Sequence, residues 1–513
     1  MPPAIRNVLA VLIVIALAVT IFANSMTKPI GRDEHMYCTA GALLAEGKMI
    51  YRDFSYVAQM PYHPLLCAVL FKVLNTTHYL LVGRMLSVIC DVFVMMCIVG
   101  LYRYIFKSFP ASGTLLGLAG AVLYVFNPFV DYANGYAWNH DVVILAAVLS
   151  FMLFISTDFK RKSKYWRIAG IGALLTFAGC MRITTVLVQL LFFAFLFYQS
   201  AESIGRRFKR VLPFLAATAL VLIWPVWTIV SAPRAFVLNL FWFPMLNGEW
   251  LRKIGLAYNK WALTYNSLTT PGYLLLIILT IYLYSVVVWH SRKPNILKEK
   301  NVLLAALLPV VFFVIAFIPI TMWKQYLAMP VPFLVIGLAY PLLYLRKSAD
   351  SINFNIHFKI VCVVISACVV VSVVSNPAVA SRTRKVLEPQ EWIPIELHRI
   401  SRDIAENIET RNSKLILTLA PLYALEGGCD IYTEFSAGLF VYRIADFLSP
   451  GDREITHTTG PKGLEALVKK SPPAAVIFGP EPEFFEEALY RSAVKPDWEK
   501  RIYSNGPIVY FRP

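Results

Sequence analysis

Apolar runs long enough to cross a membrane recur along most of this chain, and they restrict its fold more than any other feature. A transmembrane helix needs about 20 mostly apolar residues. Such runs occupy, approximately, residues 7–24, 79–102, 113–130, 141–157, 166–181, 183–200, 211–231, 272–289, 301–320, 325–345 and 358–376. Hydrophobic residues make up 58% of the 513 residues and charged residues only 15%, unlike a soluble domain. The sequence therefore predicts a polytopic α-helical membrane protein with about eleven transmembrane helices.

The distribution of positive charge predicts the orientation of these helices. The formal net charge is +17, but Lys and Arg fall in short clusters between apolar runs, so nucleic acid is not an expected partner. Short loops that stay in the cytoplasm hold most positive charge, and every second loop here is basic, at 103–107, 158–167, 205–210, 290–300 and 346–350. We expect a plasma (cell inner) membrane protein with a cytoplasmic N-terminus. The first run follows Arg6 without a convincing cleavage site, so it is predicted to be a retained span rather than a signal peptide.

This topology places three longer segments outside the membrane: the first outer loop at 25–78, a second loop at 232–271, and the chain from about 378. The first loop contains two helix-like stretches that we expect to lie on the membrane surface. Residues 378–513 alternate short apolar runs, at 414–420, 474–479 and 507–511, with helical patterns. That pattern predicts a soluble extracytoplasmic α/β domain after a membrane domain at 1–377. It contains no phosphate loop or nucleophile elbow, so a lid or docking platform is favoured.

Polar and ionisable residues gather at the predicted outer ends of the spans. Asp33 and Glu34 follow the first run in the segment GRDEHMY. Ionisable groups at membrane depth are costly, so they usually face a cavity and have a function. The other members are Arg84, Asn139, His140, Asp141, Arg182 and Lys324. Carboxylates and cations at one level suit a phosphorylated, lipid-linked substrate, because cations bind phosphate and a carboxylate accepts a proton.

Each of these residues also has a structural explanation. The acidic pair fits ordinary loop charges, and the cations at 182 and 324 fit helix-end side chains that extend to lipid headgroups. Asn139 and Asp141 are good helix-capping residue types. Arg84 shares a helix face with Asp91, seven residues later, so the two are candidates for a structural pair. Only the convergence of all these groups on one side favours a site.

The first outer loop resembles that of the GT-C glycosyltransferases. The resemblance rests on the acidic pair after the first span, the aromatic Tyr37, the turn at Gly47, IYRDF (50–54) and QMPYHP (59–64). The similar branch is the bacterial protein-O-mannosyltransferase-like one, which includes the aminoarabinose transferases of lipid A. The likeness extends to GRMLSVICDVF (83–93), GCMRITTVLVQLL (179–191), QYLAMPVPFLVIGLAY (325–340) and the outer C-terminal domain.

The resemblance implies transfer of a sugar from a polyprenyl-phosphate carrier to an acceptor on the outer side of the membrane. It implies that Asp33 is the catalytic carboxylate and that Glu34 assists it. The implied ligands of the donor phosphate are Arg182, Lys324, Arg84 and His63. His63 lies near the position where many relatives carry Lys-Pro-Pro, and it replaces that lysine only when protonated. The implied substrate pocket contains Tyr37, Tyr62, Asn139, His140, Asp141 and Tyr326.

The sequence leaves the sugar and the acceptor open. The donor sugar is a hexose, a pentose or a uronic acid, and the acceptor is lipid A, an envelope glycan or a protein. A transporter or flippase of a lipid-linked sugar is the alternative. Such a protein should show an internal repeat, and none is visible in the sequence. A non-catalytic assembly or sensor protein is a third hypothesis. The eight cysteines form no CxxC pair, and no metal-ligand set is evident, so no metal site is predicted. A divalent metal beside the two carboxylates stays open.

Overall fold

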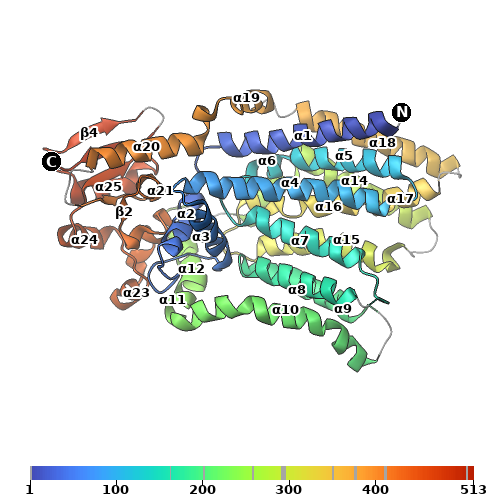
Figure 1. Cartoon of the computed structure of the whole chain (residues 1–513), viewed down its shortest axis with the longest axis horizontal. Helices are drawn as coiled ribbons and strands as arrows, with labels where there is room; N and C mark the ends of the chain where they lie inside the picture. Colours follow the sequence, from blue (N-terminus) through green and yellow to red (C-terminus); the bar gives the residue numbers. More distant parts are fainter. Residues whose placement is uncertain are drawn as a thin grey trace.

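The molecule is a bundle of long helices with a mixed α/β domain at one end. The computed structural model describes residues 3–161, 163–199, 203–256, 259–290, 296–348, 352–374, 378–408, 413–503 and 506–513. The long helices lie along the longest axis of the molecule, and the C-terminal domain lies at the end opposite to the N-terminus (Figure 1). The two chain ends are therefore on opposite sides of the bundle, as the predicted topology requires.

Each predicted span contains a helix. The bundle consists of α1 (Pro3–Thr27), α4 (Tyr79–Ile105), α5 (Pro110–Val125), α7 (His140–Ile155), α8 (Lys164–Gly179), α9 (Val186–Phe197), α10 (Ile204–Ser231), α14 (Pro271–His290), α15 (Lys300–Phe317), α16 (Val331–Gly337), α17 (Ala339–Lys347) and α18 (Ile352–Val374). The predicted span at 325–345 is divided among the short helix η4 (Lys324–Ala328), α16 and α17. In the described part of the chain, six helices are long and apolar enough to cross a membrane. The multi-pass helical fold is thus confirmed, and the count of eleven stays a prediction.

The loops between the long helices contain shorter helices: α2 (Arg32–Ala45), α3 (Tyr62–Leu74), α6 (Pro128–Ala133), α11 (Pro233–Val237), the π-helical turn η2 (Leu238–Trp242), α12 (Phe243–Lys253) and α13 (Lys260–Leu268). Figure 1 shows α2, α3, α11 and α12 between the bundle and the C-terminal domain. The two helices expected on the membrane surface are α2 and α3. Every residue from Glu34 to Leu43 is buried, so α2 is an internal helix and that expectation is corrected. In contrast, α3 exposes Val69, Val73 and Leu74, as expected of a helix with one face toward lipid.

The C-terminal domain is built around a five-stranded sheet. Its order is β2 (Asp430–Ile431), β1 (Leu415–Leu417), β3 (Ala475–Phe478), β5 (Ile508–Phe511) and β4 (Glu499–Ile502). β1 is parallel to β2 and β3, whereas β5 is antiparallel to β3 and β4. The α-helices of this part are α19 (Ala378–Lys385), α20 (Ile393–Ile408), α21 (Leu422–Leu425), α22 (Leu439–Tyr442), α23 (Pro450–Ile455), α24 (Leu464–Lys470) and α25 (Glu483–Ala493). The predicted α/β character is confirmed.

Alternation along the central strand explains the layers of this domain. In β3, Ala475 and Ile477 join the core cluster that contains residues of α20, while Val476 and Phe478 join the cluster that contains residues of α24 and α25. Successive side chains of a strand point to opposite faces, so helices cover both sides of the sheet. The cluster on the α20 side also contains Cys38 of α2. The domain and the first outer loop therefore share one hydrophobic core.

A buried ion pair joins this loop to the bundle. The Arg84 guanidinium in α4 donates to both carboxylate oxygens of Glu34 in α2, at 2.8 and 2.7 Å, and both side chains are fully buried. Its remaining N–H groups donate to the carbonyls of Ser25, Lys28 and Pro29, at and just beyond the end of α1. All five donors of the arginine are thus used.

Glu34 is equally saturated. Its carboxylate also accepts the Gly31 amide, at 2.7 Å, and the Ala137 amide, at 2.7 Å. The first of these bonds closes the N-terminal turn of α2. Arg84 therefore pairs with Glu34 and not with Asp91, whose carboxylate accepts from Tyr124 and Asn134. Since neither partner points into a cavity, we remove Glu34 from the catalytic residues and Arg84 from the phosphate ligands.

We predict that Glu34→Gln strongly destabilises the protein. The change keeps the shape of the side chain but leaves the Arg84 charge buried without its partner, which costs about 3–5 kcal/mol in typical proteins. Thermal unfolding of the detergent-solubilised full chain measures the effect. Glu46→Gln is the matched control, because Glu46 is exposed on the same outer loop and its pair with Lys48 spans 3.6 Å, a kind of contact worth about 1 kcal/mol or less. Equal melting temperatures for the two variants would contradict the structural role of Glu34.

Candidate active site

A cavity of about 360 Å³ lies where the first outer loop, the second outer loop, two bundle turns and the C-terminal domain meet. Its lining is mostly apolar, with a few polar groups. The lining residues from the N-terminal part are Asp33, Met36, Val57, Ala58, Gln59, Arg182, Ile183 and Thr184. Those from the later part are Leu240, Phe241, Phe243, Pro244, Met245, Asn247, Ile318, Pro319, Ile320, Thr321, Trp323, Tyr326 and Phe440. An apolar cavity with few convergent polar groups is typical of a ligand site.

Asp33 contributes a carboxylate to this cavity from the first turn of α2. Successive residues of a helix point about 100° apart, so Asp33 faces the cavity while the adjacent Glu34 faces α4. Burial raises the pKa of Asp33 to about 6, and the nearby charges of Arg32, Arg182 and Arg443 oppose that rise. A carboxyl group with a pKa near the working pH suits proton transfer.

Arg182 supplies a cation to the same cavity from the turn between α8 and α9. Its guanidinium lies over the Tyr326 ring, 4.6 Å from the centroid, and Nη1 is 3.0 Å from the Met329 sulfur. Among the described residues, no carboxylate forms an ion pair with it. Stacking on an aromatic ring fixes the guanidinium without using up its charge. The arrangement leaves Arg182 able to hold an anion, with Tyr326 as its platform.

Asn139 ties the cavity wall together. Its side-chain amide donates to the Gln59 side chain, at 2.8 Å, and to the Met181 carbonyl, at 3.0 Å. It makes no side-chain capping bond to α7, so the capping explanation does not hold for it. Asn139 thus links one residue that lines the cavity with the neighbour of Arg182. Asn139 itself does not line the cavity, so it holds these wall residues in position from outside the cavity.

The remaining pocket residues lie around the cavity rather than in its lining. Tyr37 packs edge-on against Tyr56 and His63, with ring centroids 5.9 and 5.0 Å away. Its pKa is raised well above the ordinary value, first by burial and then by Asp33, which places the phenol near the carboxylate. Tyr62 instead donates to the Val221 carbonyl in α10 and so anchors the loop to the bundle.

The two predicted residues that open α7 are buried inside the bundle. His140 is 2% exposed, and neither of its ring nitrogens has a hydrogen-bond partner in the described part of the chain. Asp141 is 1% exposed and accepts the Gly135 amide at 3.0 Å. Neither lines the cavity, so we assign Asp141 to the support of the turn at Gly135.

Two predicted phosphate ligands are not placed to bind an anion in this cavity. His63 is fully buried, and burial lowers its pKa to about 3, so the ring is neutral and brings no positive charge. Lys324 is exposed and is not among the residues that line the cavity, although its neighbours Trp323 and Tyr326 are. The expectation for His63 is therefore corrected, and Lys324 lies at the rim.

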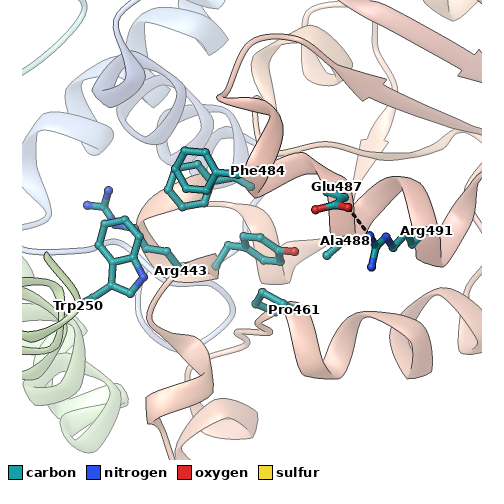
Figure 2. A pocket seen from close by; sticks show the side chains of 9 residues that line it. Trp250, Arg443, Pro461, Phe484, Glu487, Ala488 and Arg491 are labelled. Atoms are coloured by element: carbon teal, nitrogen blue, oxygen red, sulfur yellow. Dashed lines mark hydrogen bonds and ion pairs between the residues drawn. The ribbon is translucent and has the colours of Figure 1, made fainter. Parts of the chain in front are cut away.

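Sequence reasoning missed Arg443, a cation of the C-terminal domain. Its guanidinium lies between Trp250 of α12 and Phe440, 5.0 and 5.1 Å from the ring centroids. Figure 2 shows Trp250 on a helix of the second outer loop and Arg443 beside it. The two residues help to line a second pocket, of about 240 Å³. Phe440 also lines the first cavity, and the positive charge of Arg443 is one of those that oppose the rise in the pKa of Asp33. The signal in the sequence was a basic residue among aromatics, in FVYRIADF (440–447).

Comparison with known proteins gives a fold but no sequence relative. No known family profile matches the chain, and no curated protein matches its sequence. The structure is similar to that of ArnT from Cupriavidus metallidurans bound to undecaprenyl phosphate, with a TM-score of 0.63 and 12% identity over 99% of this chain and 98% of that one. The apo structure of the same ArnT gives a TM-score of 0.60 at 13% identity, over 98% and 97% of the two chains. An archaeal AglB oligosaccharyltransferase from Archaeoglobus fulgidus gives a TM-score of 0.48 at 11% identity, over 95% of this chain and 71% of that one.

The ArnT likeness extends over both parts of the chain, the helical bundle and the C-terminal domain. It agrees with the resemblance found in the first outer loop. The chain therefore has the GT-C glycosyltransferase fold.

Proposed function

We propose that this chain is a glycosyltransferase that moves a sugar from a polyprenyl-phosphate donor to an acceptor on the outer side of the plasma membrane. The observation that carries the proposal is that Asp33 and Arg182 line one cavity at the end of the bundle where the C-terminal domain lies. The fold of ArnT supports it, since that protein has been seen with undecaprenyl phosphate. The comparisons give no support to the alternative of a transporter.

Asp33 acts as the base in the proposed reaction. Its carboxylate takes the proton of the acceptor hydroxyl as the acceptor oxygen forms its bond to the anomeric carbon. The bond between that carbon and the phosphate oxygen breaks, and its electron pair leaves with the polyprenyl phosphate. Arg182 binds the phosphate and stabilises the charge that develops on it. The proton stays on Asp33 until it is released to solvent.

The second pocket suits the acceptor. Its wall combines Trp250 and Phe484 with Arg443 (Figure 2), and Arg443 is one of the charges that act on the pKa of Asp33. Aromatic rings stack on the apolar faces of sugar rings, and a guanidinium pairs with acidic groups. We therefore place the lipid donor in the largely apolar cavity and the acceptor beyond Arg443, with Asp33 between them.

Asp33→Asn is predicted to lower the transfer rate at least about a hundredfold, since a positioned base contributes about 10²–10⁴ in rate and the change removes only the charge. The assay follows transfer from synthetic polyprenyl-phosphate sugars, with the natural acceptor found by mass spectrometry of envelope glycans and lipid A with and without the gene. The matched control is Asp497→Asn, at an exposed aspartate of the C-terminal domain. A folded Asp33→Asn protein with wild-type activity would refute the assignment.

The rate should also depend on pH through Asp33. The base is active only when deprotonated, and its pKa is about 6, so kcat/KM should be level above that value and fall about tenfold per pH unit well below it. Rates measured from about pH 5 to about pH 8 with one donor give the profile. An increase in rate as the pH falls below 6 would mean that the protonated carboxyl is the active form.

Arg182→Gln should weaken donor use by about 10²–10³ in kcat/KM, the loss typical of removing one group that stabilises an oxyanion. Lys324→Gln is the comparison, because Lys324 is exposed at the rim, and it should change kcat/KM less than about threefold. Inhibition by free polyprenyl phosphate provides a second readout, which should weaken only in Arg182→Gln. The reverse order of the two variants would move the phosphate from Arg182 to Lys324.

A further inference from the structure

Two histidines and a glutamate meet where the C-terminal domain packs on the bundle. His78 is the residue just before α4, His398 lies in α20, and Glu426 directly follows α21. The imidazoles of His78 and His398 are stacked with centroids 3.5 Å apart. One ligand atom from each of the three residues lies within 4.8 Å of the others. None of the three lines either pocket described above, so this cluster is separate from the candidate active site.

The donor atoms suit a borderline divalent cation. Imidazole nitrogen and carboxylate oxygen bind Zn²⁺ at about 2.0–2.2 Å, in a tetrahedron whose neighbouring ligand atoms are therefore about 3.4 Å apart. His398 Nδ1 and Glu426 Oε2 are already 3.2 Å apart. The ligand atom of His78 is within 4.8 Å of the other two. Rotation of this imidazole, which is partly exposed, brings that atom to the distance that the tetrahedron requires. Three protein ligands leave a fourth position for water.

Glu426 and His78 each present a ligand atom to the cluster. Glu426 is fully buried, and its Oε1 accepts the Leu80 amide at 2.7 Å, which orients Oε2 toward the histidines. A hydrogen bond to the carboxylate oxygen that does not bind the metal, here Oε1, commonly supports a metal-binding carboxylate. The Nδ1 atom of His78 is buried and has no hydrogen-bond partner among the described residues.

We propose that His78, His398 and Glu426 form a binding site for a zinc-class divalent cation that fastens the C-terminal domain to the bundle. Two ligands come from the domain and one from the loop before α4, so a bound ion bridges the two parts. Leu80, which Glu426 holds, is one helical turn before Arg84. The ion therefore braces the start of the helix whose arginine fixes α2. This proposal does not depend on the glycosyltransferase activity.

The test measures zinc bound to the purified full-length protein in detergent. After equilibration with micromolar ZnCl₂ and removal of excess, inductively coupled plasma mass spectrometry should find about one ion per chain, and His398→Ala and His78→Ala should fall below about 0.2. His457→Ala is the matched control. That histidine also joins the two parts, through the Arg52 carbonyl at 3.0 Å, but lies outside the cluster, so it should keep its zinc. EDTA should lower the melting temperature of the wild type and of His457→Ala only.

A replacement ligand keeps the test valid if the alanine variants fold poorly. His398→Cys retains a zinc ligand, so it should bind one ion, and its cobalt complex should gain a thiolate charge-transfer band in the near ultraviolet that the wild-type complex lacks. Absence of stoichiometric zinc in the wild type, or equal zinc in the wild type and both alanine variants, would overturn the proposal.

Discussion

The buried pair of Arg84 and Glu34 is the contact on which the outer half of the structure depends. One guanidinium uses all five of its donors, on Glu34 and on three carbonyls at the end of α1. One carboxylate accepts four bonds, two of them from the amides of Gly31 and Ala137. Charges taken out of water are tolerated only when they are paired and fully hydrogen-bonded. Here that requirement fixes α1, α2, α4 and the 137 turn against one another.

This constraint gives the neighbouring carboxylate its role. Glu34 turns toward α4, so the next residue back along α2, Asp33, is directed toward the cavity. The wall of this cavity is fixed by separate contacts, including the stack of Arg182 on Tyr326 and the hydrogen bonds of Asn139. Of the acidic pair, Glu34 therefore holds the fold and Asp33 faces the cavity, where we propose that it acts as the base. A positioned base requires a rigid support of this kind.

Several features were predictable from the sequence because their signals are local. Apolar length predicted the helices, and alternating patterns predicted the C-terminal sheet. The resemblance of the first outer loop singled out Asp33 as the catalytic carboxylate, which stays a prediction. The partner of Arg84 was not predictable, because Asp91 shares its helix face whereas Glu34 is fifty residues away in sequence. The proximity of Arg443 to Asp33 was missed for the same reason, since it depends on how the C-terminal domain packs on the outer loops.

The burial of α2 shows a second limit of sequence patterns. An amphipathic stretch after a span is typical of a helix at the membrane surface, but here the C-terminal domain covers it, with Cys38 in a core shared with α20. The zinc-site proposal depends on the same packing, because His78 and His398 come from parts of the chain that only the folded structure brings together.

A cryo-EM structure of the protein with bound polyprenyl phosphate tests the central claim most directly. The account predicts that the phosphate lies within hydrogen-bond distance of Arg182, beside the Tyr326 ring, and that the Asp33 carboxylate faces the phosphate across the space for one sugar. The Arg84 and Glu34 side chains should remain paired and out of contact with the ligand. A phosphate bound to Arg84, or a ligand in a cavity that does not contain Asp33, would contradict the account.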